Sequence, residues 1–310
     1  MQSKAYGESL LTDSVESYTD DQLSDHIGLI RKQLSEKRQH SLVIDLLPTS
    51  VSKAYADREK LEDASLSIEL ARKLGVRTPG IQRIVERRDR FECILDRVSG
   101  PTLMSSWASL GWFATFRLGL QLRGMVRRMR NQTSPVVGSL GTGIARTFWL
   151  EDDVYGIPLR PSSRLITSLV NFWYNLRAFR LEKGKSEKEH LATCEGPISE
   201  QPLVFTHHDL APRNLMIDQA GDLVIIDWDY AGYYPPYFEH AGMYNFFPPE
   251  DWGWMGMLRW RVFSWLATGF YSREKSILFE VRRKTQRFPA SRRFNILAGA
   301  TPSRRKPDDY

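Results

Sequence analysis

Residues 205–232, FTHHDLAPRNLMIDQAGDLVIIDWDYAG, concentrate side chains that could carry out chemistry. Asp209 lies shortly before Asn214, and Asp227 follows a second apolar run. The two apolar runs around Ala220-Gly221 predict a β-hairpin, whose outer ends would bring Asn214 and Asp227 together. An amide oxygen beside a carboxylate suits Mg²⁺, which prefers hard oxygen ligands. The segment could therefore be a hydrolytic metal site, a phosphoryl-transfer site or only a polar hairpin.

Phosphoryl transfer from a nucleotide would give each of these polar residues a task. It needs one carboxylate to orient or deprotonate the attacking hydroxyl, and separate ligands for Mg²⁺ on the phosphates. Asp209 fits the first task. Asn214 and Asp227 fit the second. His207 is expected to hold the loop and thereby to fix Asp209. The alternative is a metal-dependent hydrolase built from the same aspartates, which would work without nucleotide.

The order and spacing of these residues resemble the aminoglycoside phosphotransferase and choline kinase family, in the pattern HxDxxxxN followed by IDWD (residues 207–214 and 226–229). Two segments, THHDLAPRNLMID and IIDWDYAGYYPPYFEH, resemble the sequences of the fungal-type branch of this family. The resemblance spans about residues 40–245. It implies an α+β chain with a bilobal protein-kinase-like fold, in which a small β-rich N-lobe precedes a larger, mainly helical C-lobe.

The same resemblance makes Asp229 a further candidate for the metal, because its position in the family is acidic. It also implies an activity. The family transfers the γ-phosphate of ATP, with Mg²⁺, to a hydroxyl of a small molecule, so the chain is expected to be a small-molecule kinase. The acceptor would be aminoglycoside-, choline- or sugar-like, because all of these use the scaffold and the fold does not decide among them. No nucleic-acid partner is expected. The oligomeric state is not fixed by the sequence.

The resemblance also assigns nucleotide contacts in the first 100 residues. The family has a strand lysine that contacts the phosphates and pairs with a glutamate of the next helix, which points to Lys53. Its partner would be Glu62 in the first place, with Asp63 and Glu69 as alternatives. The stretch FECILDRVSG resembles the hinge, where backbone groups around Asp96 and Val98 would meet the adenine.

One departure from the family leaves a second function open. Residues 41–52, before Lys53, contain no glycine, so no glycine-rich loop is available to cover the phosphates. A catalytically silent pseudokinase, acting as a nucleotide-binding or interaction module, is therefore the alternative to an active enzyme.

Hydrophobic periodicity outlines the elements that must position these residues. The first 100 residues read as strand, strand, helix, strand, strand after a polar helical start. Long helices are expected from residue 103 to 129, from 164 to about 184, and between 249 and 287. The expected domains are an N-terminal helical extension (1–40), a nucleotide-binding N-lobe (41–98), a catalytic and substrate-binding C-lobe (99–272) and a basic, partly disordered tail (273–310).

Composition and charge restrict the class of protein. The 310 residues include only two cysteines, which excludes a disulfide framework and fits a reducing, cytoplasmic compartment. The chain starts with no apolar signal segment, and no long uncharged run predicts a membrane span. The net charge is +6, yet residues 273–306 alone hold 11 basic and two acidic side chains. A solvated tail explains this excess more simply than binding to nucleic acid or membrane.

An aromatic segment, residues 252–265, has two interpretations. It could bury Trp252, Met255, Trp260 and Phe263 in the core of the C-lobe, or it could surround a cationic substrate through cation–π contacts. Core packing is the preferred interpretation.

Overall fold

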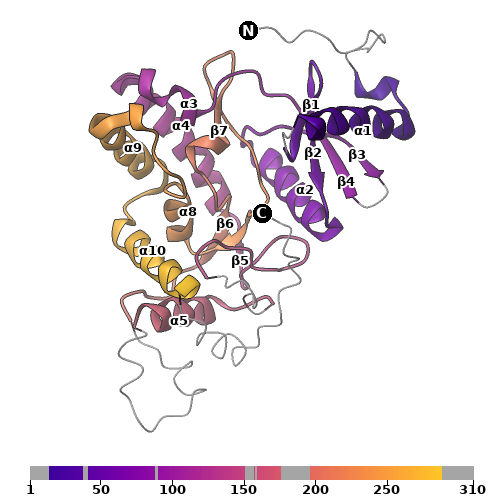
Figure 1. Ribbon diagram of the computed structural model, residues 1–310. Helices are drawn as coiled ribbons and strands as arrows, with labels where there is room; N and C mark the ends of the chain where they lie inside the picture. Colours follow the sequence, from indigo (N-terminus) through magenta and orange to yellow (C-terminus); the bar gives the residue numbers. More distant parts are fainter. Residues whose placement is uncertain are drawn as a thin grey trace. The chain divides into compact units, whose positions relative to one another are not determined.

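The computed structural model has the predicted order of elements in the first 100 residues (Figure 1). It describes residues 14–37, 41–87, 90–150, 157, 159–175 and 196–287. The chain divides into two compact units: unit 1 holds residues up to Leu61 together with Pro79–Val98, and unit 2 holds Glu62–Thr78 and all residues from Ser99. Unit 1 is small and rich in strands and unit 2 is mainly helical, so the predicted α+β class is confirmed.

Unit 1 is built on a four-stranded antiparallel sheet in the order β1-β2-β4-β3. The strands are β1 (Val43–Leu47), β2 (Ser50–Tyr55), β3 (Ile81–Arg87) and β4 (Arg90–Asp96). β1 turns directly into β2 because only Pro48 and Thr49 separate them. β2, which carries Lys53, therefore lies between β1 and β4, with Lys53 opposite Val43 and Cys93.

One face of this sheet is covered by the N-terminal elements η1 (Val15–Ser17) and α1 (Asp20–Glu36). A capping box between Thr19 and Gln22 starts α1. The helix buries Leu23 and Ile27 against a core that includes Ile44, Leu46, Val85 and Ile94 of the strands. The N-terminal helix is thus part of the core of unit 1.

A buried ion pair joins α1 to the sheet. Arg31 of α1 donates to both carboxylate oxygens of Glu92 in β4, each at 2.8 Å. Glu92 is fully buried and also accepts a hydrogen bond from Ser52, with Arg87 3.5 Å away. The charge of Glu92 is therefore tolerated because Arg31 and its neighbours compensate it.

Unit 2 contains α2 (Arg58–Lys73) from Glu62 onward and every element after β4. Its helices, including 3-10 turns, are α3 (Leu103–Ser106), η2 (Trp107–Ser109), α4 (Trp112–Arg130), α5 (Ser163–Tyr174), η3 (Pro212–Asn214), α8 (Pro236–Gly242), η4 (Glu250–Trp252), α9 (Gly253–Thr268) and α10 (Ser272–Arg287). Its strands are β5 (Thr133–Ser134), β6 (Leu203–Thr206), β7 (Leu215–Ile217), β8 (Leu223–Ile225) and β9 (Gly232–Tyr234).

The single long helix predicted from residue 103 is wrong, because the chain breaks between α3 and α4. Arg259 of α9 donates hydrogen bonds to the carbonyl oxygens of Trp107 and Leu110. Those carbonyls are thus held by a distant side chain, and α4 begins only after Gly111. The helix predicted from residue 164 is confirmed as α5 up to Tyr174, and its predicted continuation past 175 lies outside the described residues.

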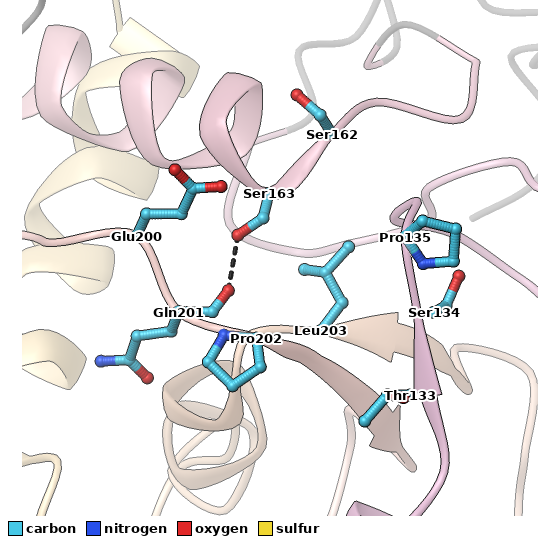
Figure 2. A pocket seen from close by; sticks show the side chains of 9 residues that line it. All are labelled: Thr133, Ser134, Pro135, Ser162, Ser163, Glu200, Gln201, Pro202 and Leu203. Carbon is cyan, nitrogen blue, oxygen red and sulfur yellow. Dashed lines mark hydrogen bonds between the residues drawn. The ribbon is translucent and has the colours of Figure 1, made fainter.

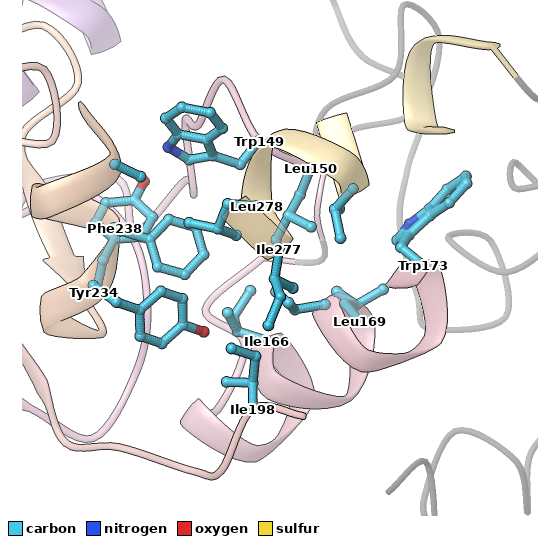
Figure 3. Close-up of a cluster of buried hydrophobic side chains, with 14 of the residues drawn as sticks. Trp149, Leu150, Ile166, Leu169, Trp173, Ile198, Tyr234, Phe238, Ile277 and Leu278 are labelled. Atoms are coloured by element: carbon cyan, nitrogen blue, oxygen red, sulfur yellow. The ribbon is translucent and has the colours of Figure 1, made fainter. Parts of the chain in front are cut away.

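The core of unit 2 lies between α5, α8 and α10, where Trp149, Ile166, Phe238 and Leu278 are among the side chains that meet (Figure 3). Residues 273–287, the first part of the predicted basic tail, belong to α10, whose Ile277 and Val281 are also buried there. The remaining tail lies outside the described residues. Among the residues that the structure describes, no helix has the length and apolar character needed to cross a bilayer.

Candidate active site

The candidate site is built where β6 ends. β6 is fully buried between β5 and β9, and its last residue, Thr206, leads into a loop that contains His207 and Asp209. The loop closes with η3, and the chain then runs into the β7–β8 hairpin. The predicted hairpin is confirmed: Leu215 pairs with Ile225, and Gly221 adopts a positive φ of 82° in the turn. A rigid antiparallel pair therefore anchors both ends of the polar cluster.

The hairpin brings Asn214 and the segment leading to Asp227 together. The N–H of Ile226 donates to the carbonyl oxygen of Asn214 at 3.0 Å, directly before Asp227. Asp227 has a φ of 68°, a left-handed conformation that is uncommon for a residue with a side chain. Its side chain is exposed, and Asp229 is half-buried two residues later. A backbone outlier of this kind is often found at functional sites.

Asp209 is buried and held by three side chains. Arg213 donates to its Oδ2 at 2.7 Å, and Asn214 Nδ2 donates to the same oxygen at 2.9 Å. Asn245 Nδ2 approaches the other oxygen, Oδ1, at the longer distance of 3.3 Å. The carboxylate is therefore fixed mainly through Oδ2.

Burial raises the pKa of Asp209 to about 6, although the Arg213 guanidinium and the bond from Asn245 act in the opposite direction. The negative charge of Asp227 adds to the rise in the pKa of Asp209. A carboxyl group whose pKa lies near neutrality is suited to proton transfer.

His207 connects the loop to the hairpin. Its Nδ1 accepts the N–H of Asp209 at 3.3 Å, so its Nε2 carries the proton and donates to the carbonyl oxygen of Ile226 at 3.0 Å. The ring lies edge-on to Trp228, with centroids 4.7 Å apart. His207 thus links the backbone of Asp209 to the residue that precedes Asp227.

Glu239 of α8 is a supporting residue that the sequence reasoning missed. Its two carboxylate oxygens accept the consecutive N–H groups of His207 and His208, at 2.9 and 2.6 Å. Burial raises the pKa of Glu239 to about 7, although the two hydrogen bonds from His207 and His208 act to lower this pKa. The positive φ of His208, 70°, turns both N–H groups toward the one carboxylate. No local pattern signals this partner, because it lies more than 30 residues away.

His208 is a buried structural residue. Its Nε2 contacts the hydroxyl of Thr147 at 2.8 Å, and its ring packs on Tyr234 with centroids 4.1 Å apart. Burial lowers the pKa of His208 to about 3, so the ring is neutral.

A second missed feature lies on the other side of Asp209. Arg213 donates through Nη1 to the carbonyl oxygen of Asn245 at 2.6 Å, and Arg282 of α10 donates to Asn245 Oδ1 at 2.9 Å. Asn245 therefore connects α10 to the side chain of Asp209. The i,i+4 spacing of Asp209 and Arg213 could have indicated their ion pair from the sequence. No sequence pattern indicates the contacts of Asn245 and Arg282.

The predicted nucleotide residues are distributed over both units. Lys53, Asp96 and Val98 lie in unit 1, and Glu62 lies on the exposed face of α2 in unit 2. Lys53 is buried, with its Nζ 5.2 Å from the centre of the Tyr55 ring. The carboxylate of Asp96 accepts hydrogen bonds from Gly80 N–H and Gln82, at 2.7 and 2.8 Å.

Asp63, an alternative partner for Lys53, has a different environment. Its carboxylate accepts two backbone N–H groups, from Gly141 at 3.0 Å and Thr142 at 2.8 Å, and a short bond from Arg146. Burial alone would raise the pKa of Asp63, but the bonds from Arg146 and Thr142 lower it below the usual value. Asp63 therefore anchors the loop before Thr147, whereas the other two candidate partners, Glu62 and Glu69, are exposed.

The aromatic segment is core in most positions. Trp252, Trp260 and Phe263 are buried around Trp107, with ring centroids 5.2–5.7 Å from it. The guanidinium over Trp107 belongs to Arg259 of the same segment, so these rings are already in contact with a cation of the chain itself. The predicted burial of Met255 is wrong, because Met255 lies on the solvent side of α9.

One pocket of about 400 Å³ lies elsewhere in unit 2 (Figure 2). It is lined by residues 133–135, 162–163 and 200–203, at the amino end of β6. Asp209 follows the carboxyl end of the same strand, so this pocket is separate from the polar cluster.

Comparison with known proteins agrees with the motif. Residues 162–263 match the model of the phosphotransferase enzyme family. This segment contains the loop, the hairpin and Asp227, so the resemblance seen in the sequence is confirmed there, while the fungal-type branch stays a prediction. No curated protein matches the chain.

Several solved structures are similar in fold at low sequence identity. A thermostable mutant of aminoglycoside phosphotransferase APH(4)-Ia, apo form, is 13% identical over 83% of this chain and 88% of its own, with a TM-score of 0.47. APH(3'')-Id from Streptomyces rimosus is 13% identical over 76% and 86%, with a TM-score of 0.46. Spectinomycin phosphotransferase APH(9)-Ia, solved with ADP and spectinomycin, is 13% identical over 83% of each chain, with a TM-score of 0.43.

Proposed function

We propose that this chain, whose central segment matches the phosphotransferase enzyme family, is a small-molecule kinase that transfers the γ-phosphate of ATP to a hydroxyl group. The observation that supports this most is the assembly of Asp209, Asn214 and Asp227 by one loop and one hairpin. Phosphoryl transfer depends mainly on positioning and charge neutralisation, which a rigid cluster of this kind can provide.

Asp209 is proposed as the group that orients the acceptor hydroxyl and takes its proton. Its Oδ2 is occupied by Arg213 and Asn214, whereas Oδ1 has one long contact, to Asn245. Oδ1 is therefore the oxygen that we assign to the acceptor. His207 fixes the backbone of Asp209 and is proposed to support it without contacting the substrate.

The donor set fits a magnesium ion. Asn214 uses Nδ2 for both of its bonds to Asp209, at 2.9 Å, which leaves Oδ1 as the end of the amide that can bind a cation. Asp227 supplies an exposed carboxylate, and Asp229 is a further candidate. Among the described residues no group of three or more acids, histidines or cysteines could hold a metal alone, which suits an ion that takes its other ligands from phosphates and water. Bound there, Mg²⁺ would neutralise charge on the phosphates.

The nucleotide is proposed to bind through Lys53 at the phosphates, supported by Glu62, and through backbone groups at Asp96 and Val98 at the adenine. The acceptor is proposed to be an aminoglycoside-, choline- or sugar-like alcohol. A pseudokinase is the second candidate. It is favoured by the glycine-free turn Pro48-Thr49, which offers no flexible loop to cover phosphates.

Thermal denaturation with and without Mg-ATP, combined with a measurement of ATP hydrolysis, separates these candidates. The kinase predicts stabilisation by Mg-ATP and turnover that Asp209→Ala and Asp227→Ala abolish. Stabilisation without any turnover favours the pseudokinase. Turnover of phosphate esters without nucleotide would instead indicate a metal-dependent hydrolase.

A further inference from the structure

Helix α4 of unit 2 exposes large apolar side chains on one face. Phe113 is 82% exposed, and Phe116 and Leu120 follow it at spacings that place all three on the same side of the helix. Trp112 is partly exposed beside them, with its ring 6.0 Å from that of Phe116. Buried positions such as Leu118 and Leu122 lie on the opposite side. The exposed row is therefore additional to the face that packs into the core.

Helix α9 repeats this arrangement. Trp254 is 75% exposed, and Leu258 and Trp265 continue along the same face, with Met255 next to them. Beyond the helix, Phe270 is exposed and packs on Trp265 with ring centroids 4.3 Å apart.

The two exposed rows lie on neighbouring helices, because α4 and α9 pack side by side (Figure 1). Gly119 of α4 permits close contact, since a methyl group there would lie 3.2 Å from Leu266 of α9. We call the exposed apolar side chains of these two helices and of the adjoining Phe270 the aromatic face; it consists of Trp112, Phe113, Phe116, Leu120, Trp254, Met255, Leu258, Trp265 and Phe270. Isolated exposed apolar side chains are ordinary, but so many on two neighbouring helices indicate an interaction site.

The charge of these helices identifies the kind of partner. α4 and α9 together contain seven arginines and no aspartate or glutamate. Arg123 and Arg127 continue the exposed row of α4, and Arg261 lies in the exposed row of α9. The aromatic face thus combines tryptophan and phenylalanine with three exposed arginines, Arg123, Arg127 and Arg261.

We propose that the aromatic face binds the surface of a membrane that contains anionic phospholipids. Tryptophan and phenylalanine settle at the boundary between headgroups and acyl chains, and arginines are attracted to anionic headgroups. Such binding needs no membrane-crossing helix. It places the chain on the surface through unit 2 and is independent of the proposed phosphotransfer.

Two other partners fit the aromatic face less well. A symmetric dimer through this face would set the same arginine-rich helices of two copies against each other, with like charges opposed. A nucleic acid would neutralise the arginines but would leave aliphatic positions such as Leu120, Leu258 and Met255 without an apolar partner.

Vesicle co-sedimentation of the full chain tests the proposal. Vesicles of phosphatidylcholine with phosphatidylserine should bind the protein, and pure phosphatidylcholine vesicles should bind it much less. Phe116→Ser with Leu120→Ser should reduce binding strongly. Arg123→Glu with Arg127→Glu should reduce binding to the anionic vesicles by roughly tenfold or more, because each basic side chain near the surface contributes measurably to the attraction.

Matched controls lie in exposed positions outside the aromatic face. Leu29→Ser in α1 removes a leucine as exposed as Leu120, 60% against 58%, and should leave binding unchanged. Arg58→Glu with Lys73→Glu in α2 changes the net charge by the same amount as the arginine pair and should have little effect. Equal melting temperatures for all variants exclude unfolding as the cause.

The proposal is overturned by any of three results. The first is absence of binding to anionic vesicles. The second is a dimer in analytical ultracentrifugation that the Phe116 and Leu120 substitutions dissociate. The third is release of the wild-type chain from the vesicles by an oligonucleotide at a lower concentration than soluble phosphoserine requires.

Discussion

Arg213 and Asp209 form an ion pair of 2.7 Å inside the candidate active site, with the guanidinium partly exposed and the carboxylate buried. The pair holds Oδ2 of Asp209, and Asn214 donates to the same oxygen. The opposite oxygen, Oδ1, has only the longer contact with Asn245, and it is the oxygen that we propose for the acceptor. Arg213 is therefore expected to affect both the geometry and the ionisation of Asp209.

The first prediction concerns pH. Burial raises the pKa of Asp209 to about 6, and only the ionised form can take a proton, so the turnover rate should rise with pH through about 6 and level off above it. Arg213 lowers this pKa, so Arg213→Gln should move the rise to higher pH. Arg213→Lys keeps the charge and should move it less. Identical pH profiles for the wild type and Arg213→Gln would contradict the assigned electrostatic role.

The second prediction concerns α10, which lies beyond the segment that matches the family. Arg282 holds Asn245 at 2.9 Å, and Asn245 contacts both Asp209 and Arg213. Arg282→Gln should lower the turnover rate several-fold while leaving the KM for ATP nearly unchanged, because a small misplacement of a catalytic group is costly. Arg283→Gln, at the exposed neighbouring position, is the control and should behave like the wild type. An equal effect of both substitutions would argue against a positioning role.

The third prediction concerns the support of the loop. In Glu239→Gln an amide N–H group would face the backbone N–H groups of His207 and His208, which would leave a buried donor without an acceptor. The free energy of unfolding should fall by about 1–3 kcal/mol. Urea denaturation followed by fluorescence measures the change. An unfolding free energy equal to that of the wild type within experimental error would contradict the assigned contacts.

The fourth prediction concerns unit 1. Arg31→Met leaves the charge of the buried Glu92 without its principal partner, so it should destabilise unit 1 by about 3 kcal/mol. Adding Glu92→Leu removes the unpaired charge and should restore most of the loss. Hydrogen exchange of the β2 and β4 amides reports on this unit directly. A double variant no more stable than Arg31→Met would refute the compensation.

The cluster of Asp209, Asn214 and Asp227 was predictable from the sequence because a local rule assembles it. A tight turn between two short apolar runs determines which residues meet at the open end of a hairpin. The strands and helix of the first 100 residues follow from periodicity in the same way.

The supporting contacts were not predictable, because they join residues far apart in the chain. Glu239 reaches His207 across more than 30 residues, and Arg282 reaches Asn245 from another helix. The interruption after α3 has a similar origin, since Arg259 of α9 binds the carbonyls that a continuous helix would have used. Periodicity describes one element at a time and does not specify such pairs.

The central claim is that Asp209 serves a nucleotide-dependent transfer to a small alcohol. A screen of alcohol-containing metabolites, amino alcohols and aminoglycosides for Mg-ATP consumption, run in parallel on the wild type and Asp209→Asn, tests it most directly. We predict that at least one acceptor stimulates ATP consumption by the wild type and yields a phosphorylated product, and that Asp209→Asn binds Mg-ATP but forms none. Product formation by Asp209→Asn at the wild-type rate, or no stimulation by any acceptor while Mg-ATP is bound, would contradict it.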